Sequence, residues 1–106
     1  MPQDSRAMTK IRVKVHRRGS DILIAACDEG LLGRLLKDDK LRLDVSDEFY
    51  GGDQGGEEML VSRLAAATMA NLVGEVVCRI AAEHDFIDPD CLITIEGVPH
   101  AQMVRY

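Results

Sequence analysis

The sequence predicts an α+β domain in which two helices pack on one face of a mainly antiparallel sheet of four to five strands. Two stretches near the N-terminus have the alternating or continuous apolar pattern of strands, and two helical patterns follow them. The order of these elements also lacks the regular strand–helix alternation of a doubly wound sheet. With 106 residues, of which 46% are hydrophobic, the chain can form one modest core.

The first two strands are predicted to form a hairpin. From Ile11 onward, apolar residues alternate with cations and a histidine, which is typical of a half-buried strand. The apolar run from Asp21 to Cys27 predicts a second, more deeply buried strand. Gly19 and Ser20 lie between the two runs and favour a tight turn.

The middle of the chain is predicted to contain short elements and a loop. Asp28 can cap a helical turn over residues 29–32, which ends at Gly33. Alternation over residues 41–45 predicts a third strand. Four glycines between residues 51 and 56 predict a mobile loop, because each glycine disfavours helix by about 1 kcal/mol.

Helical spacing dominates the segment that follows. It predicts one helix over Glu57–Val73, with acids near its N-terminus, and a second over Glu75–His84. Gly74 separates the two patterns. After a turn near residue 89, the chain is expected to add a strand at 92–96, a bend at Gly97–Pro99 and a short strand at 103–104.

The ends of the chain and its cysteines bear on its location. Residues 1–10 show no periodicity, so we expect a flexible arm before a single compact domain over 11–106. The chain contains neither the apolar region of a secretory signal nor the ~20 apolar residues of a membrane span. Its three cysteines are widely spaced and do not form the framework of a small disulfide-bonded domain. We therefore expect a cytoplasmic protein with no membrane partner.

Four motifs carry a resemblance to a known family. They are Cys27-Asp28-x-x-Leu31-Leu32-Gly33, Phe49-Tyr50-Gly51-Gly52, Ala67-Thr68-x-Ala70-Asn71-x-Val73-Gly74-Glu75 and Gly97-Val98-Pro99-His100-Ala101-Gln102. In this order and spacing they resemble the archaeal domain-of-unknown-function family 424, over residues 11–105. The resemblance implies a compact, cytoplasmic archaeal protein. It implies no reaction, because the family has none assigned.

Polar residues inside the second half of the helical region are candidates for ligand binding. Thr68, Asn71 and Glu75 share one face if the helix continues past Gly74. That face would present an amide and a carboxylate to a ligand. The structural alternative is that Thr68 and Asn71 bond to the backbone of the glycine loop.

The C-terminal motif contains a further candidate, His100. Pro99 stiffens the chain just before it, and Gln102 would lie on the same face of a strand. An imidazole in this position suits a general base, a metal ligand or a hydrogen-bonded latch that holds the C-terminal segment.

Cys27 is the sharpest candidate for catalysis. Because Asp28 is expected to cap a helical turn, the thiol of Cys27 would lie near a helix N-terminus, where thiolates are favoured. A pair with His100, oriented by Asn71, would have the residue types of a cysteine hydrolase. The alternative is a small buried hydrophobe at the end of an apolar run. The spacings predict no metal site and no cofactor.

Two surface features complete the candidates. The segment Phe49-Tyr50-Gly51-Gly52 holds half of the aromatic residues, and it is either a binding lid or a loop anchored in the core by one ring. The acid-free segment near the N-terminus is either a contact for phosphates or a solvated face of an edge strand, although the net charge is −5. Its cations are Lys10, Arg12, Lys14, Arg17 and Arg18.

These observations favour a non-enzymatic binding or accessory protein with an RNA, ribonucleoprotein or protein partner. The alternative is a small enzyme with Cys27 or His100 as the reactive group and with Asn71 and Glu75 in positioning roles. That alternative requires all four side chains to surround one open pocket. A third hypothesis is a homo-oligomer that pairs through apolar strand edges.

Overall fold

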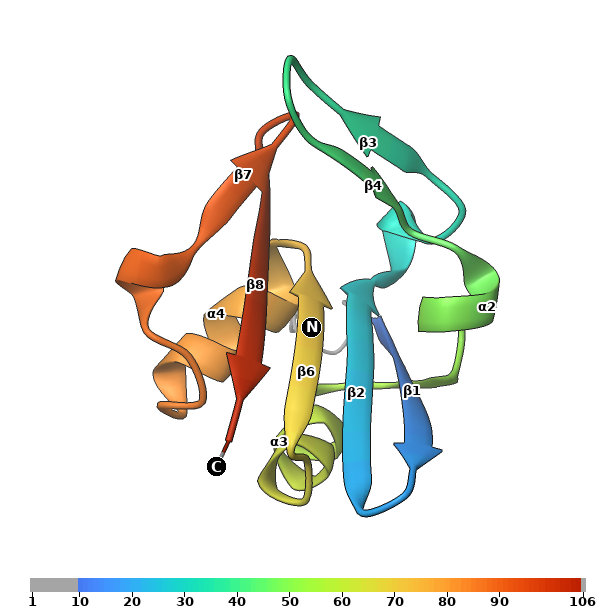
Figure 1. The fold of residues 1–106 in the computed structure, drawn as a ribbon, viewed down its shortest axis with the longest axis vertical. Coiled ribbons are helices and arrows are strands. Elements are labelled where there is room, and N and C mark those ends of the chain that lie inside the picture. Colours follow the sequence, from blue (N-terminus) through green and yellow to red (C-terminus); the bar gives the residue numbers. More distant parts are fainter. Residues whose placement is uncertain (1–9, 106) are drawn as a thin grey trace, which may run out of the picture.

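The computed structural model describes residues 10–105, which form a six-stranded mixed sheet with helices on one face and a small second sheet on the other (Figure 1). The strand order in the large sheet is β5-β1-β2-β6-β8-β7. Its strands are β1 (Ile11–Arg18), β2 (Asp21–Asp28), β5 (Asp53–Gly55), β6 (Met69–Val73), β7 (Ile93–Ile95) and β8 (Val98–Val104). Among these strands β2 and β6 pair in parallel, and the other four pairings are antiparallel.

Three α-helices and a short hairpin complete the fold. They are α2 (Asp47–Tyr50), α3 (Glu57–Ala65), α4 (Glu75–Glu83), β3 (Leu35–Lys37) and β4 (Arg42–Asp44). The predicted α+β class is therefore confirmed. The predicted four to five strands and two helices are corrected to six strands in a mixed sheet, two strands in a second sheet, and three helices. The predicted N-terminal arm lies outside the described residues, except for Lys10. None of the helices within residues 10–105 is long and apolar enough to cross a membrane.

The predicted N-terminal hairpin is confirmed. β1 and β2 pair from Ile11↔Asp28 to Arg18↔Asp21, and Gly19 and Ser20 form the two-residue turn. Gly19 has φ +60°, a conformation that glycine adopts without steric cost. The alternating pattern of β1 buries Ile11 and Val13 on the helical side of the sheet.

The long helix predicted over Glu57–Val73 is wrong in its second half. α3 ends at Ala65, and Met69–Val73 forms β6, which lies between β2 and β8 in the middle of the sheet. Ala70 and Leu72 are buried against the helices and Val73 is buried on the opposite face, whereas Met69 is exposed and Asn71 is half-buried. The strand is only five residues long and its apolar residues continue the spacing of the preceding helix, so periodicity alone does not distinguish it from a helical segment.

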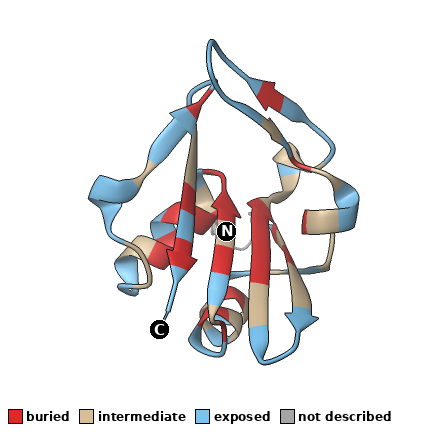
Figure 2. Ribbon diagram, in the orientation of Figure 1, coloured by how far each residue is buried: buried red, intermediate tan, exposed pale blue. Residues whose placement is uncertain are grey.

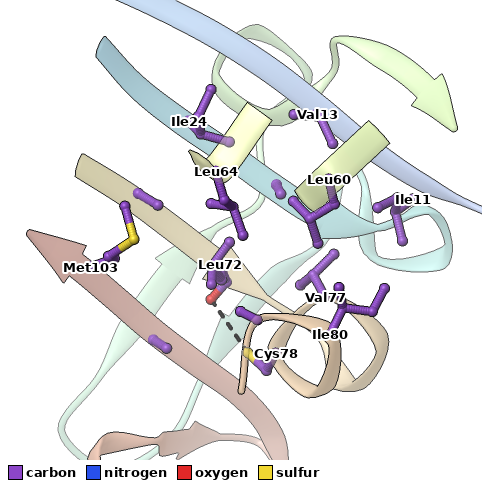
Figure 3. Close-up of a cluster of buried hydrophobic side chains, with 14 of the residues drawn as sticks. Ile11, Val13, Ile24, Leu60, Leu64, Leu72, Val77, Cys78, Ile80 and Met103 are labelled. Carbon is purple, nitrogen blue, oxygen red and sulfur yellow. Dashed lines mark hydrogen bonds between the residues drawn. The ribbon is translucent and has the colours of Figure 1, made fainter. Parts of the chain in front are cut away.

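The main core lies between the sheet and the two longer helices (Figure 3). Leu60 and Leu64 of α3 and Val77 of α4 are fully buried against Ile24 of β2 and Leu72 of β6. Full burial of such side chains stabilises the fold by roughly 1.5–3 kcal/mol each. The predicted packing of two helices on one face of the sheet is thus present in α3 and α4.

A second, smaller cluster lies on the opposite face of the sheet. Leu36 of β3, Tyr50 of α2 and Val45, which lies between β4 and α2, are buried there against Cys27 and Val73. In Figure 1 the β3–β4 hairpin and α2 cover one end of this face, and among residues 10–105 no helix or hairpin lies on the other end. Along β8 buried and exposed residues alternate (Figure 2), with Ala101 and Met103 buried and Gln102 and Val104 exposed. The face is therefore divided into a covered half and an open half.

The last two strands turn at Glu96–Gly97, where a bend at Gly97–Pro99 was predicted. Glu96 and Gly97 have φ of +53° and +77°, which is typical of the tight turn that joins two antiparallel strands. The carboxylate of Glu96 accepts a hydrogen bond of 2.7 Å from the backbone N–H of Lys37. The turn is thereby connected to the β3–β4 hairpin. β8 contains every residue of the C-terminal motif except Gly97, which lies in the turn.

Asp28 connects the end of β2 to the start of α4. Its carboxylate accepts hydrogen bonds from the N–H groups of Val76 and Val77, each 3.1 Å long. Asp28 was predicted to cap the turn that directly follows it, but that turn, Glu29–Leu31, has no side-chain cap bond. Gly74 is required beside this contact because its φ is +120° and a Cβ there would overlap the Asp28 carboxylate. Two residues of the family motifs thus have a structural role.

We expect Asp28→Ala to lower the free energy of unfolding by about 2 kcal/mol, because two N–H groups at the start of α4 lose their acceptor. The matched control is Asp88→Ala, since Asp88 caps only the exposed 3₁₀ turn Pro89–Cys91 and should cost less than ~1 kcal/mol. Urea unfolding measures both values. Equal losses in the two variants would contradict this role of Asp28.

Candidate functional site

The cations of β1 hold the segment that contains α2. Lys14 Nζ donates a 2.6 Å hydrogen bond to the carbonyl of Glu48, and His16 Nε2 lies 2.9 Å from the carbonyl of Phe49. Since a carbonyl only accepts, His16 donates from Nε2. Arg12 donates to the carbonyl of Gly52 and to the carboxylate of Glu29. Part of the predicted basic patch therefore forms hydrogen bonds with the backbone of the segment that includes the predicted glycine loop.

The aromatic residues of this segment are packed rather than free. The Phe49 ring stacks on the His16 imidazole, with 4.7 Å between centroids and 19° between planes. Tyr50 is buried in the second cluster, and burial raises the pKa of its phenol to about 12. A Cβ at Gly52 would overlap the carbonyl oxygen of Val13 and lie 2.6 Å from the Cα of Lys14. These contacts support the interpretation of an anchored loop over that of a lid.

Directly paired residues of neighbouring strands point to the same side of a sheet. The register of β1, β2, β6 and β8, with β7 in one case, therefore places their side chains in rows across one face. The row nearest the free end of the sheet is His16, Leu23, Met69 and Val104. The next contains Lys14, Ala25, Asn71 and Gln102. The third contains Arg12, Cys27, Val73, His100 and Ile93. We use the name open face for Leu23, Met69, Asn71, Gln102 and Val104.

The open face exposes large apolar side chains. Met69 is 38% exposed and Val104 is 53% exposed, and Ile93, in the neighbouring row, is 46% exposed. Within residues 10–105, only Leu35 and Leu41 are comparable apolar residues, and both belong to the β3–β4 hairpin region. Single exposed apolar residues need no explanation, but three on one side of a sheet mark a candidate contact surface.

A cavity of about 780 Å³ borders the open face. Leu23 and Met69 line it from β2 and β6, and Phe49 lines it from α2. The end of the β1–β2 hairpin supplies the remaining lining residues: Val15, His16, Arg17, Arg18 and Asp21. Arg17 and Arg18 are exposed and have no ion-pair partner within the described residues.

The amides of Asn71 and Gln102 form a pair at the centre of the open face. Gln102 Nε2 donates a 3.1 Å hydrogen bond to Asn71 Oδ1 across β6 and β8. Asn71 was predicted to lie on a helix face with Thr68 and Glu75, and this arrangement is wrong because β6 is a strand. Glu75 instead begins α4, on the opposite side of the sheet.

Thr68 has a structural role at the start of β6. Its Oγ1 accepts a 2.9 Å hydrogen bond from the N–H of Ile22, and its own N–H donates to the Ile22 carbonyl. The predicted side-chain-to-backbone bond is therefore present, but its partner is β2 and not the glycine loop. Thr68 extends the parallel pairing of β2 and β6 by one residue.

His100 is held to the neighbouring strand. Its Nδ1 lies 3.0 Å from the carbonyl of Leu72, so Nδ1 carries a proton and donates a hydrogen bond to this carbonyl, and Nε2 takes no part in the bond. Pro99, just before it, accepts a hydrogen bond from the N–H of Gly74. This arrangement is the latch that the sequence suggested as one alternative for His100.

Cys27 does not have the surroundings of a catalytic nucleophile. Its side chain is fully buried, and burial, together with the nearby Asp28 carboxylate, raises the pKa of the thiol to about 12. Val73 of β6 lies between Cys27 of β2 and His100 of β8 in their row. β2 and β8 are therefore two strand spacings, roughly 10 Å, apart. Cys27, Asn71, Glu75 and His100 do not surround one pocket, and the enzyme arrangement that required this is not present.

No group of His, Cys, Asp and Glu side chains within residues 10–105 is arranged to hold a metal ion. Asn71 and Gln102 of the open face were predicted as candidates, whereas Leu23, Met69 and Val104 were missed because the sequence pattern assigned Met69 to a helix and placed no strand at 98–102. Alternation from Val98 to Val104 is the signal that could have identified β8.

We expect a single thiol to react with Ellman's reagent in the native protein at pH 8. Cys91 is exposed, whereas Cys27 and Cys78 are buried and burial raises the pKa of each to about 12. All three should react in denaturant, and Cys91→Ser should leave no fast-reacting thiol. Rapid labelling of Cys27 in the folded Cys91→Ser protein would contradict the burial described here.

We expect Gly52→Ala to lower the free energy of unfolding by more than ~2 kcal/mol, because the new methyl group would displace α2 from β1. Gly30→Ala is the control, since a Cβ at Gly30 meets nothing within 4 Å and should cost less than ~0.5 kcal/mol. Thermal or urea unfolding of the two variants gives the comparison. Similar stability of both would show that the Gly52 contact with β1 is unimportant.

Comparisons with known proteins agree with this fold. A crystal structure of an uncharacterized conserved protein from Methanopyrus kandleri superimposes with a TM-score of 0.75 and 26% sequence identity, over 92% of this chain and 95% of that one. None of the curated proteins matches the chain. The family model described as protein of unknown function (DUF424) matches residues 16–106. The resemblance predicted from the four motifs is therefore confirmed, with a start at residue 16 where 11 was expected, and the chain belongs to the DUF424 family, whose function is unknown.

Proposed function

We propose that this protein is a non-enzymatic accessory protein that binds a protein partner through the open face of its sheet. The observation that carries the proposal is the exposure of Met69 and Val104 beside the Asn71–Gln102 pair, on a face whose other half is covered. An apolar centre with a few oriented polar groups is the usual composition of a protein-binding surface.

The charges of β1 support a protein partner over RNA. Lys14 and His16 donate to carbonyl groups of α2, and Arg12 to Gly52 and Glu29, so these groups are already engaged within the protein. The Phe49 ring is stacked on His16, although recognition of single-stranded RNA depends on free aromatic faces. The net charge of −5 also opposes bulk attraction to nucleic acid.

Cytoplasmic location and the absence of a reaction are part of the proposal. The buried Cys27 thiol and the latched His100 support a binding role over the alternative of a small enzyme. His100 Nε2 is not used by this latch and lies at the border of the open face, where it can form a hydrogen bond with a partner.

Site-specific photo-crosslinking in cells tests this function. With p-benzoylphenylalanine in place of Val104, we expect a crosslinked product of one defined mass that resists ribonuclease. The same group in place of Arg79, which is exposed on α4, is the matched control and should give no such product. Met69→Lys should reduce the yield about tenfold, because it places a charge in an apolar contact, and should leave the melting temperature nearly unchanged.

Three outcomes would contradict the proposal. Equal crosslinking from both positions would show that the open face is not selective. A product that ribonuclease removes would indicate an RNA partner. A product with the mass of two copies of this chain would indicate a homo-oligomer.

A further inference from the structure

The outer edge of β1 is only partly covered. β5 pairs with Ile11, Arg12 and Val13, and no described strand lies beside β1 from residue 14 to 18. In Figure 1 the arrowhead end of β1 has no ribbon strand along its outer side. An uncovered edge presents backbone donors and acceptors to which another strand can pair.

The turn of the hairpin determines which backbone groups point outward. In a two-residue hairpin the closing pair, here Arg18↔Asp21, exchanges both of its hydrogen bonds. Alternate residues of β1 therefore bond to β2, and the N–H and C=O groups of Val15 and Arg17 point away from it. The same alternation predicts that Ile22, opposite Arg17, points away from β1, and Ile22 does bond to Thr68 on the β6 side.

Val15 and Arg17 have no other backbone partner within residues 10–105. β1 and β5 are already paired through Val13↔Asp53, the preceding outward position. A further strand could pair with the same edge of β1, next to the end of β5. It would continue the hydrogen bonding begun by β5 and meet the unpaired N–H and C=O groups of Val15 and Arg17.

The surroundings of this edge determine the chemistry of its occupant. The cavity beside it has an apolar part formed by Leu23, Phe49 and Met69. Arg17 and Arg18 are exposed and project to opposite sides of β1. Asp21 is the single acid among the lining residues, and its carboxylate lies 3.3 Å from the Thr68 hydroxyl, which donates to it. An occupant with acidic and apolar residues is complementary to this arrangement.

We propose that an extended acidic segment of the protein partner adds as a strand to β1 beside Val15 and Arg17. Its backbone pairs with these two residues, one face of the segment places apolar side chains in the cavity, and the carboxylates on its other face lie near Arg17. This inference rests on the proposed function, since it names the part of the partner that the protein recognises. Backbone pairing provides affinity in this mode, and the side chains provide selectivity.

Nuclear magnetic resonance with a model peptide tests the proposal. The probe is a short blocked peptide that alternates valine with glutamate, and the control peptide has lysine in place of each glutamate. At millimolar concentration the acidic peptide should shift the amide signals of Val15 and Arg17 and slow their hydrogen exchange. In the free protein these two amides should exchange faster than those of His16 and Arg18, which bond to β2.

Two variants separate backbone pairing from charge. Arg17→Pro removes an N–H that β2 does not use, so the fold should persist while peptide affinity falls about tenfold. Arg17→Ala keeps the N–H and removes the charge, and should weaken binding only about threefold, with less effect at high salt.

The proposal is overturned if the acidic peptide produces no shift, if both peptides bind equally, or if Arg17→Pro and Arg17→Ala have the same affinity. Concentration-dependent line broadening in the free protein, abolished by Arg17→Pro, would assign the edge to a second copy of the chain and overturn it as well. If Met69→Lys abolishes crosslinking from position 104 but Arg17→Pro does not, this inference fails and the proposed function stands. If neither variant affects crosslinking, both fail.

Discussion

The fold depends on the parallel pairing of β2 with β6. This pairing places an apolar strand in the middle of the sheet, so the elements before and after that strand decide how each face is covered. The chain runs from α3 into β6 and from β6 into α4. These two helices together cover one face of the sheet and form the main core with it. The opposite face receives only α2 and the β3–β4 hairpin, which are too small to cover it. The open face is a consequence of this unequal distribution.

Polar contacts at the ends of the strands keep this arrangement in place. Asp28, at the end of β2, caps α4, and Thr68, at the start of β6, bonds to β2. Lys14 and His16 of β1 donate to carbonyl groups of α2 on the opposite face. Several family-motif residues therefore have structural roles, although their residue types resemble those of a binding or catalytic site. Polar residues at the ends of strands and helices commonly cap backbone groups.

The elements predicted best were those with strong local patterns. Alternation identified β1, and the two-residue turn identified the first hairpin, because both depend only on neighbouring residues. Met69–Val73 was assigned to a helix because this strand is short and its apolar residues continue the helical spacing that precedes it. The candidate site was affected directly by this error, since Asn71 was placed with Glu75 instead of with Gln102. The partners of Asp28 and Lys14 are distant in the chain, and no local pattern encodes them.

The uncovered parts of the molecule lie together. The open face, the cavity next to Phe49 and the free edge of β1 are contiguous, and α3 and α4 lie behind them. Hydrogen exchange of the chain purified with its native partner, compared with the chain stripped of it, tests this account most directly. The account predicts slower exchange at Val15 and Arg17 and along β8, with unchanged exchange in α3 and α4. Protection confined to α3 and α4 would contradict it.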